Sequence, residues 1–132
     1  MKEISYIYRI YTYDKLWGGD ILYISVEKHK DNLLIQFKGE LDHHSSEIVR
    51  QKIDQQYLDQ RIRNIILDLR GLTFMDSSGI GLIMGRYKNC LEKKGKLSIV
   101  NDNPQVDKML KMSGLLKIIN VYPTIESAIE NI

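Results

Sequence analysis

The sequence predicts a single α/β domain with a mostly parallel sheet, an antiparallel N-terminal hairpin and about four helices packed against the sheet. The evidence is that short apolar runs rich in β-branched residues alternate with amphipathic segments of helical spacing. Strands that alternate with helices imply parallel pairing through right-handed crossovers. The regular pattern occupies residues 21–132, whereas residues 1–20 form an N-terminal extension.

The first half of the domain begins with strands expected at residues 21–26 and 33–37. The polar connection at residues 29–32 favours an antiparallel hairpin. Asp42 follows the second strand and is suited to cap a helix over residues 43–60. The apolar residues expected on the buried face of that helix are Ile48, Val49, Ile53 and Tyr57.

The second half continues with a buried strand at residues 65–69 and a helix at residues 78–94, which Gly95 is suited to end. Cys90 lies on the apolar stripe of this helix and is expected in the core. The remaining elements are a strand at residues 96–100, a helix from Pro104 to about Ser113, a strand at residues 118–122 and an amphipathic helix at residues 125–132.

Residues 1–20 have high strand propensity, but their apolar residues follow neither strict alternation nor helical spacing. One interpretation is an extra edge strand. The other is that translation starts later, because the run from Trp17 to Gly19 implies G-rich codons like those of a ribosome-binding site. The sequence leaves both open.

Composition argues for an ordinary soluble domain and against several function classes. Hydrophobic residues make up 43% and charged residues 27%, and the net charge is only +2. No nucleic-acid or membrane partner is therefore expected. No apolar run approaches the ~20 residues of a transmembrane helix, and no signal peptide is evident. The expected location is the cytoplasm.

The most informative segment lies between the strand at residues 65–69 and the helix at residues 78–94. Asp76, Ser77 and Ser78 occupy this strand-to-helix corner, and Asp and Ser are common N-caps. Such a corner points unpaired backbone N–H groups and the positive end of the helix dipole at whatever binds there. A serine hydroxyl at this place is either a cap or a site of chemistry.

Two enzymatic interpretations of the corner are weaker. A hydrolase nucleophile elbow needs glycine two residues before and after its serine, but Met75 and Gly79 flank Ser77. No histidine follows that could act as the base. A phospho-receiver domain would use Asp68 as phosphoacceptor with Glu40 or Asp42 holding magnesium, but the initial hairpin and the serines at the corner argue against it.

No metal or nucleotide site of the protein's own is expected. His43 and His44 are adjacent and cannot share one helix face, and no Cys or carboxylate spacing supports zinc. The glycine-rich motifs that cradle phosphates are also missing from the sequence.

Several motifs occur in a characteristic order along the chain. They are Gly-Glu-Leu-Asp-His-His at residues 39–44, Phe-Met-Asp-Ser-Ser-Gly at 74–79, Gly-Arg-Tyr-Lys at 85–88, Met-Ser-Gly-Leu at 112–115 and Lys-Ile-Ile at 117–119. Together they resemble the STAS-domain anti-sigma factor antagonists, in particular the sporulation members that antagonise the anti-sigma-F factor. The resemblance covers about residues 24–132 and excludes residues 1–20.

The resemblance implies a protein-binding switch and not an enzyme. In this family the unphosphorylated protein binds an anti-sigma factor that is also a serine kinase, and the sigma factor is released. The kinase holds the ATP and phosphorylates the serine directly after the Asp of the motif, here Ser77, and a PP2C-type phosphatase reverses this. No cofactor is implied for this chain. The alternative within the family is a STAS module of a stress-response or stressosome pathway.

The expected partner surface surrounds Ser77 and continues along the helix at residues 78–94. On the side away from the apolar stripe, Leu82 is expected to be exposed between two glycines, forming a flat surface that a partner's backbone can approach. The residues assigned to partner binding are Asp42, Asp76, Ser78, Gly79, Gly81, Leu82, Gly85 and Arg86.

Overall fold

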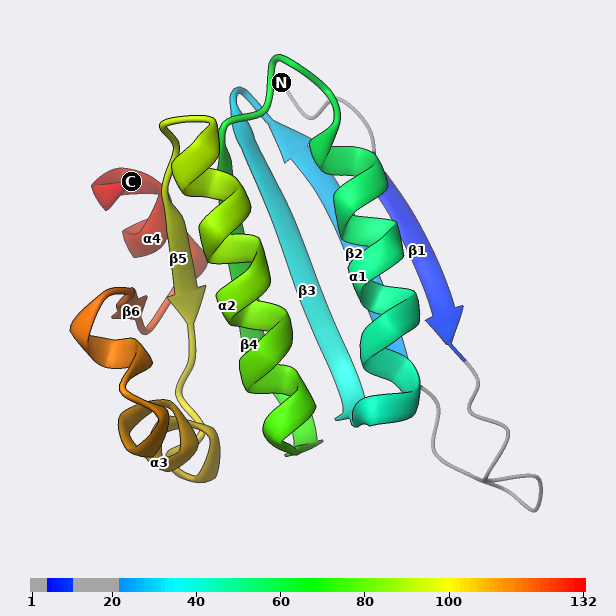
Figure 1. Cartoon of the computed structure of the whole chain (residues 1–132), viewed down its shortest axis with the longest axis vertical. Coiled ribbons are helices and arrows are strands. Elements are labelled where there is room, and N and C mark those ends of the chain that lie inside the picture. Colours follow the sequence, from blue (N-terminus) through cyan, green and yellow to red (C-terminus); the bar gives the residue numbers. More distant parts are fainter. Residues whose placement is uncertain (1–4, 11–21) are drawn as a thin grey trace.

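The structure is a computed structural model that describes residues 5–10 and 22–132 (Figure 1). In the described residues the strands are β1 (Ser5–Ile10), β2 (Leu22–His29), β3 (Asn32–Leu41), β4 (Asn64–Met75), β5 (Leu97–Val100) and β6 (Asn120–Tyr122). They form one sheet in the order β1-β2-β3-β4-β5-β6. The β1/β2 and β2/β3 pairs are antiparallel, and the three remaining pairs are parallel.

Helices cover both faces of this sheet. They are α1 (His43–Tyr57), α2 (Ser77–Glu92), α3 (Pro104–Ser113) and α4 (Ile125–Asn131), with a 3-10 turn at Leu115–Lys117. Helices α1 and α2 lie side by side on one face (Figure 1), above the main core. On the other face, α4 packs through Ala128 onto Leu34, Ile66 and Val100. Among the described residues no helix is long and apolar enough to span a membrane.

The predicted fold class and element order are confirmed, with differences in the bounds. Strand β1 adds a second antiparallel pairing at the sheet edge. The rest of the N-terminal extension, including residues 17–19, lies outside the described residues, as does Ile21. Helix α1 ends at Tyr57 and not near residue 60.

The buried face of α1 also differs from the prediction at one position. Ile48 is 37% exposed, so its expected burial was wrong. The buried residues at four-residue spacing are Ser45, Val49, Ile53 and Tyr57. Ile48 precedes Val49 by one position, which turns its side chain about 100° away from that stripe.

Strands β3 and β4 are longer than predicted, and two glycines permit their extension. The β3/β4 register shifts between Gln36 and Lys38 and again beside Gly39, whose φ of 118° suits glycine. A Cβ atom at Gly71 would lie 2.2 Å from the carbonyl oxygen of Phe37, so glycine lets the strands stay close. Both strands therefore run directly into the helices that follow them.

A lysine holds the far end of α1 against α2. Lys93, the C-cap residue of α2, donates hydrogen bonds from Nζ to the carbonyl oxygens of Tyr57, Asp59 and Ile62. Its ammonium also lies 3.9 Å from the centroid of the Tyr57 ring. The contact with Tyr57 satisfies a carbonyl group that the end of α1 leaves unpaired.

Candidate partner-binding site at two helix N-termini

Two strand-to-helix corners lie next to each other because Leu41 of β3 pairs with Met75 of β4. At the first corner, Asp42 caps α1 by accepting hydrogen bonds from the N–H groups of His44 at 3.0 Å and Ser45 at 2.9 Å. Ser45 Oγ accepts the Asp42 N–H at 3.0 Å and completes a capping box. Burial raises the pKa of Asp42, but the hydrogen bonds from Ser45 and His44 outweigh it, so the pKa lies below its ordinary value.

At the second corner, Asp76 caps α2 and also reaches across to α1. Its Oδ1 accepts the Ser78 N–H at 2.8 Å, and its Oδ2 accepts the His43 N–H at 3.2 Å. One carboxylate therefore satisfies backbone donors at the N-termini of both helices.

Ser77 is the first residue of α2 and is exposed. Its hydroxyl makes no hydrogen bond within the described part of the chain, whereas Ser78 is partly covered by its neighbours. Gly79 is buried, and a Cβ atom added there would lie 2.4 Å from Met75 Cγ. The corner thus presents the exposed Ser77 hydroxyl at the convergence of two helix N-termini.

Next to the corner, α1 and α2 enclose a groove with a cavity volume of about 370 Å³. We call it the α1–α2 groove. Its lining residues are His43, Ser46, Glu47, Arg50, Ser78, Gly81, Leu82, Gly85 and Arg86. The structure thus brings together most of the residues expected at the partner surface, and Asp42 and Asp76 lie at the adjoining corners.

The expected exposure of Leu82 was wrong. Leu82 is only 5% exposed and Arg86 only 6%, because α1 packs beside α2 on the side that the apolar stripe leaves free. The residues contributed by α1 were not assigned from the sequence. Only the His43 position carried a signal, because it belongs to the motif at residues 39–44.

Charged side chains link the two helices along this groove. Arg86 Nε lies 2.9 Å from Asp54 Oδ1, and Arg50 contacts both Glu47 and Asp54. Burial lowers the pKa of Arg86, and the opposing effect of Asp54 does not compensate for it.

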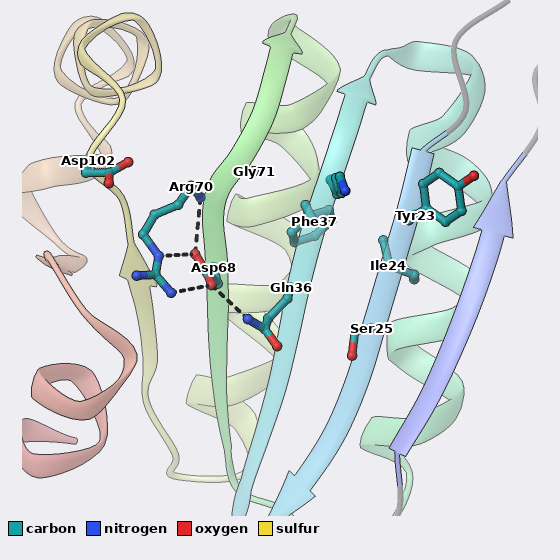
Figure 2. A pocket seen from close by; sticks show the side chains of 10 residues that line it. Tyr23, Ile24, Ser25, Gln36, Phe37, Asp68, Arg70, Gly71 and Asp102 are labelled. Carbon is teal, nitrogen blue, oxygen red and sulfur yellow. Dashed lines mark hydrogen bonds and ion pairs between the residues drawn. The ribbon is translucent and has the colours of Figure 1, made fainter.

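The opposite face of the sheet carries a separate polar cavity of about 610 Å³, formed over β2, β3 and β4 (Figure 2). Asp68 lies between Arg70 and Gln36, and both of its oxygens accept hydrogen bonds from the Arg70 guanidinium, each at 2.9 Å. The buried Asp68 is therefore held in an ion pair with the partly exposed Arg70, and Asp42 is engaged in capping α1. This arrangement does not support the phospho-receiver alternative. Within residues 5–10 and 22–132, no group of three or more His, Cys, Asp or Glu residues is placed to hold a metal ion.

The sheet with its hairpin start, the two capped corners and the serine at the second corner define a STAS domain. The family model described as "STAS domain" matches residues 23–128. The chain is 44% identical over 101 residues to an anti-sigma F factor antagonist of Paenibacillus polymyxa, covering 76% of this chain and 86% of that protein. It therefore belongs to the STAS-domain anti-sigma factor antagonists.

Solved structures agree with this assignment. The fold matches a structure of the anti-sigma factor antagonist SpoIIAA in its unphosphorylated form, with a TM-score of 0.73 and 34% identity over 82% of this chain and 94% of that one. It also matches the Bacillus cell fate determinant SpoIIAA in its phosphorylated form, with a TM-score of 0.67 and 33% identity over 82% and 97% of the two chains.

Proposed function

We propose that the unphosphorylated protein binds an anti-sigma factor that is also a serine kinase, and thereby releases a sigma factor. The kinase then uses ATP to phosphorylate Ser77, which ends the binding, and a PP2C-type phosphatase restores the active form. The observation that carries this proposal is the exposed, unengaged Ser77 hydroxyl beside the α1–α2 groove. The similarity to an anti-sigma F factor antagonist, and to SpoIIAA in both its unphosphorylated and its phosphorylated form, supports the same function.

A phosphate on Ser77 would change the charge of the contact surface strongly. It adds about −1.5 to −2 charges at neutral pH. Repulsion from one partner carboxylate about 5 Å away is on the order of 3 kcal/mol per charge at an effective dielectric constant near 20. A loss of that size weakens binding by roughly two orders of magnitude. A partner carboxylate at that distance would therefore let charge alone weaken the interaction strongly.

The same phosphate has no electrostatic reason to unfold the domain. Helix N-termini stabilise anions, and apart from the capping carboxylates of Asp42 and Asp76 neither α1 nor α2 has an acidic residue in its first turn. The relative SpoIIAA matches this fold in both phosphorylation states, which supports a switch that acts through local charge and bulk.

The direct test is incubation with the anti-sigma kinase and ATP, followed by mass-spectrometric mapping of the phosphorylated residue. We expect phosphate on Ser77 and none on Ser77→Ala. Ser78→Ala is the matched control, because it removes the neighbouring hydroxyl and is expected to keep labelling. Persistent labelling of Ser77→Ala, or a phosphopeptide that maps to Ser78, would show that the assignment is wrong.

A further inference from the structure

Gly81 and Gly85 occur in the middle of α2, where glycine destabilises a helix relative to alanine. A Cβ atom added at either position would meet no other atom within 4 Å. Contacts among the described residues therefore do not require glycine there, in contrast to Gly79 beside Met75. Because these two glycines have no side chain, only backbone forms the α2 side of the α1–α2 groove at their positions. Another backbone can therefore approach it closely.

Arg86 lines the same groove and carries an unused hydrogen-bond donor. Only 7% of its side chain is exposed, and its Nη1 finds no hydrogen-bond partner among the described residues. Burying a donor without an acceptor is unfavourable. Because Nη1 is inaccessible from the groove, an acceptor there would remove this cost if the Arg86 guanidinium turned toward it.

The charges around Arg86 indicate what kind of acceptor fits. Asp54 contacts Arg86 through Oδ1 and Arg50 through Oδ2, and it also accepts a hydrogen bond from Asn89 at 3.4 Å. Arg50 has a second carboxylate, Glu47, whereas Asp54 is the only carboxylate paired with Arg86 in the part of the chain that the structure describes. An additional carboxylate would therefore be matched to Arg86, because guanidinium groups bind carboxylates through two adjacent donors.

We propose that the α1–α2 groove receives an acidic segment of the anti-sigma factor. Its backbone packs over Gly81 and Gly85, and the Arg86 guanidinium, buried in the free protein, turns toward the groove and donates a hydrogen bond from Nη1 to one of its carboxylates. This inference rests on the function proposed above and adds the chemistry of the partner's contact segment. It also identifies what the phosphate on Ser77 would repel. Ser78 lines the same groove, so a phosphate on the neighbouring Ser77 repels a carboxylate-bearing segment.

The glycine part of the proposal is tested with Gly81→Ala and Gly85→Ala. Each change should raise the melting temperature by about 2–5 °C, because alanine favours the helix and the added methyl group meets open space. Each should also weaken binding to the anti-sigma factor at least tenfold in calorimetric titration. Lys88→Ala, on the exposed side of α2, is the matched control and should bind within twofold of wild type. Alanine variants that bind like wild type would overturn the proposal.

The carboxylate part is tested with Arg86→Gln and single Asp→Asn or Glu→Gln replacements in the partner. Arg86→Gln should weaken binding at least tenfold, and Arg50→Gln should weaken it less, because Arg50 already has two carboxylates. One acidic replacement in the partner should weaken binding to the wild-type protein and have no further effect on Arg86→Gln. If no replacement is coupled to Arg86 in this way, the acidic segment is excluded.

These tests separate the inference from the function on which it rests. A wild-type protein that neither binds the kinase nor is phosphorylated by it contradicts the proposed function, and the inference with it. A wild-type protein that does both, with glycine variants of unchanged affinity, contradicts only the inference. The glycine variants keep the test decisive even if Arg86→Gln loses stability, since they are expected to stabilise the fold.

Discussion

The Asp76 carboxylate accepts the backbone N–H of His43 at 3.2 Å while it caps its own helix through Ser78. Residues 33 positions apart in the sequence are thereby joined at the place where β3 and β4 end. Because Ser77 follows Asp76 directly, the position of the proposed phosphoacceptor depends on this bridge. The geometry of the Ser77 corner is thus a property of two helices, and neither helix alone would produce it.

Asp76→Ala should lower the free energy of unfolding by about 1–2 kcal/mol, because it removes the α2 cap and the acceptor for His43. It should also speed amide hydrogen exchange at His43, although that residue lies on the other helix. Urea unfolding and exchange measured by NMR check both effects. Asp42→Ala is the matched control, since it removes the cap of α1 but leaves the cap of α2 in place. Unchanged exchange at His43 in Asp76→Ala would contradict the bridge.

The phosphorylated and unphosphorylated backbones should be nearly superimposable, with a large difference in affinity for the anti-sigma factor. The reason is that the phosphate on Ser77 lies at converging helix N-termini, which stabilise an anion. Ser77→Asp should reproduce much but not all of the loss in affinity, because it carries less charge and bulk. Crystal structures of both forms and binding titrations are the measurements. A phosphorylated form in which α2 has moved or melted would point to a conformational mechanism.

The Asp68–Arg70 pair should contribute to stability in a pH-dependent way. Burial raises the pKa of Asp68, but hydrogen bonds from Arg70 and Gln36 outweigh it, so the folded-state pKa lies below the ordinary value. The pKa of an aspartate in the unfolded chain is about 4. The contribution of the pair to stability is therefore fully present above about pH 4 and is lost as the pH falls through the folded-state pKa. Asp68→Asn should lower the free energy of unfolding by about 1–3 kcal/mol at pH 7, and by progressively less as the pH is lowered. Urea unfolding from pH 7 to pH 2 measures this, and a pH-independent difference would contradict it.

Deletion of residues 1–20 should leave binding to the anti-sigma factor within twofold of wild type. Among residues 5–10 and 22–132, strand β1 pairs only with β2, at the sheet edge, and the Ser77 corner follows β4. Binding titration of the shortened and full-length proteins tests this, and a loss of affinity would contradict it. A large fall in melting temperature on deletion would show that β1 is a structural strand of the working domain. Intact-mass measurement of the native protein would show whether residues 1–20 are present in it.

The parts of the fold that the sequence predicted depend on local patterns. Apolar periodicity located the helices, and Asp76 marked the start of α2 because a capping residue acts on its immediate neighbours. The extension of β4 to Met75 was not predicted, because it depends on contact between Gly71 and the distant Phe37. The burial of Leu82 was missed for the same reason, since α1 covers it from a distant part of the chain.

The contact of Lys93 with the C-terminal end of α1 has a consequence for the kinetics of partner binding. Lys93 joins the C-terminal ends of α1 and α2 through the Tyr57 carbonyl group, beyond the residues that line the α1–α2 groove, and Asp76 joins their N-terminal ends beside the groove. The width of the groove is therefore set before any partner arrives. Association with such a preformed surface needs no slow opening step, so its observed rate should rise linearly with partner concentration and reach no plateau. Gly81, Gly85 and Arg86 then control the dissociation rate of the complex, and not its association rate.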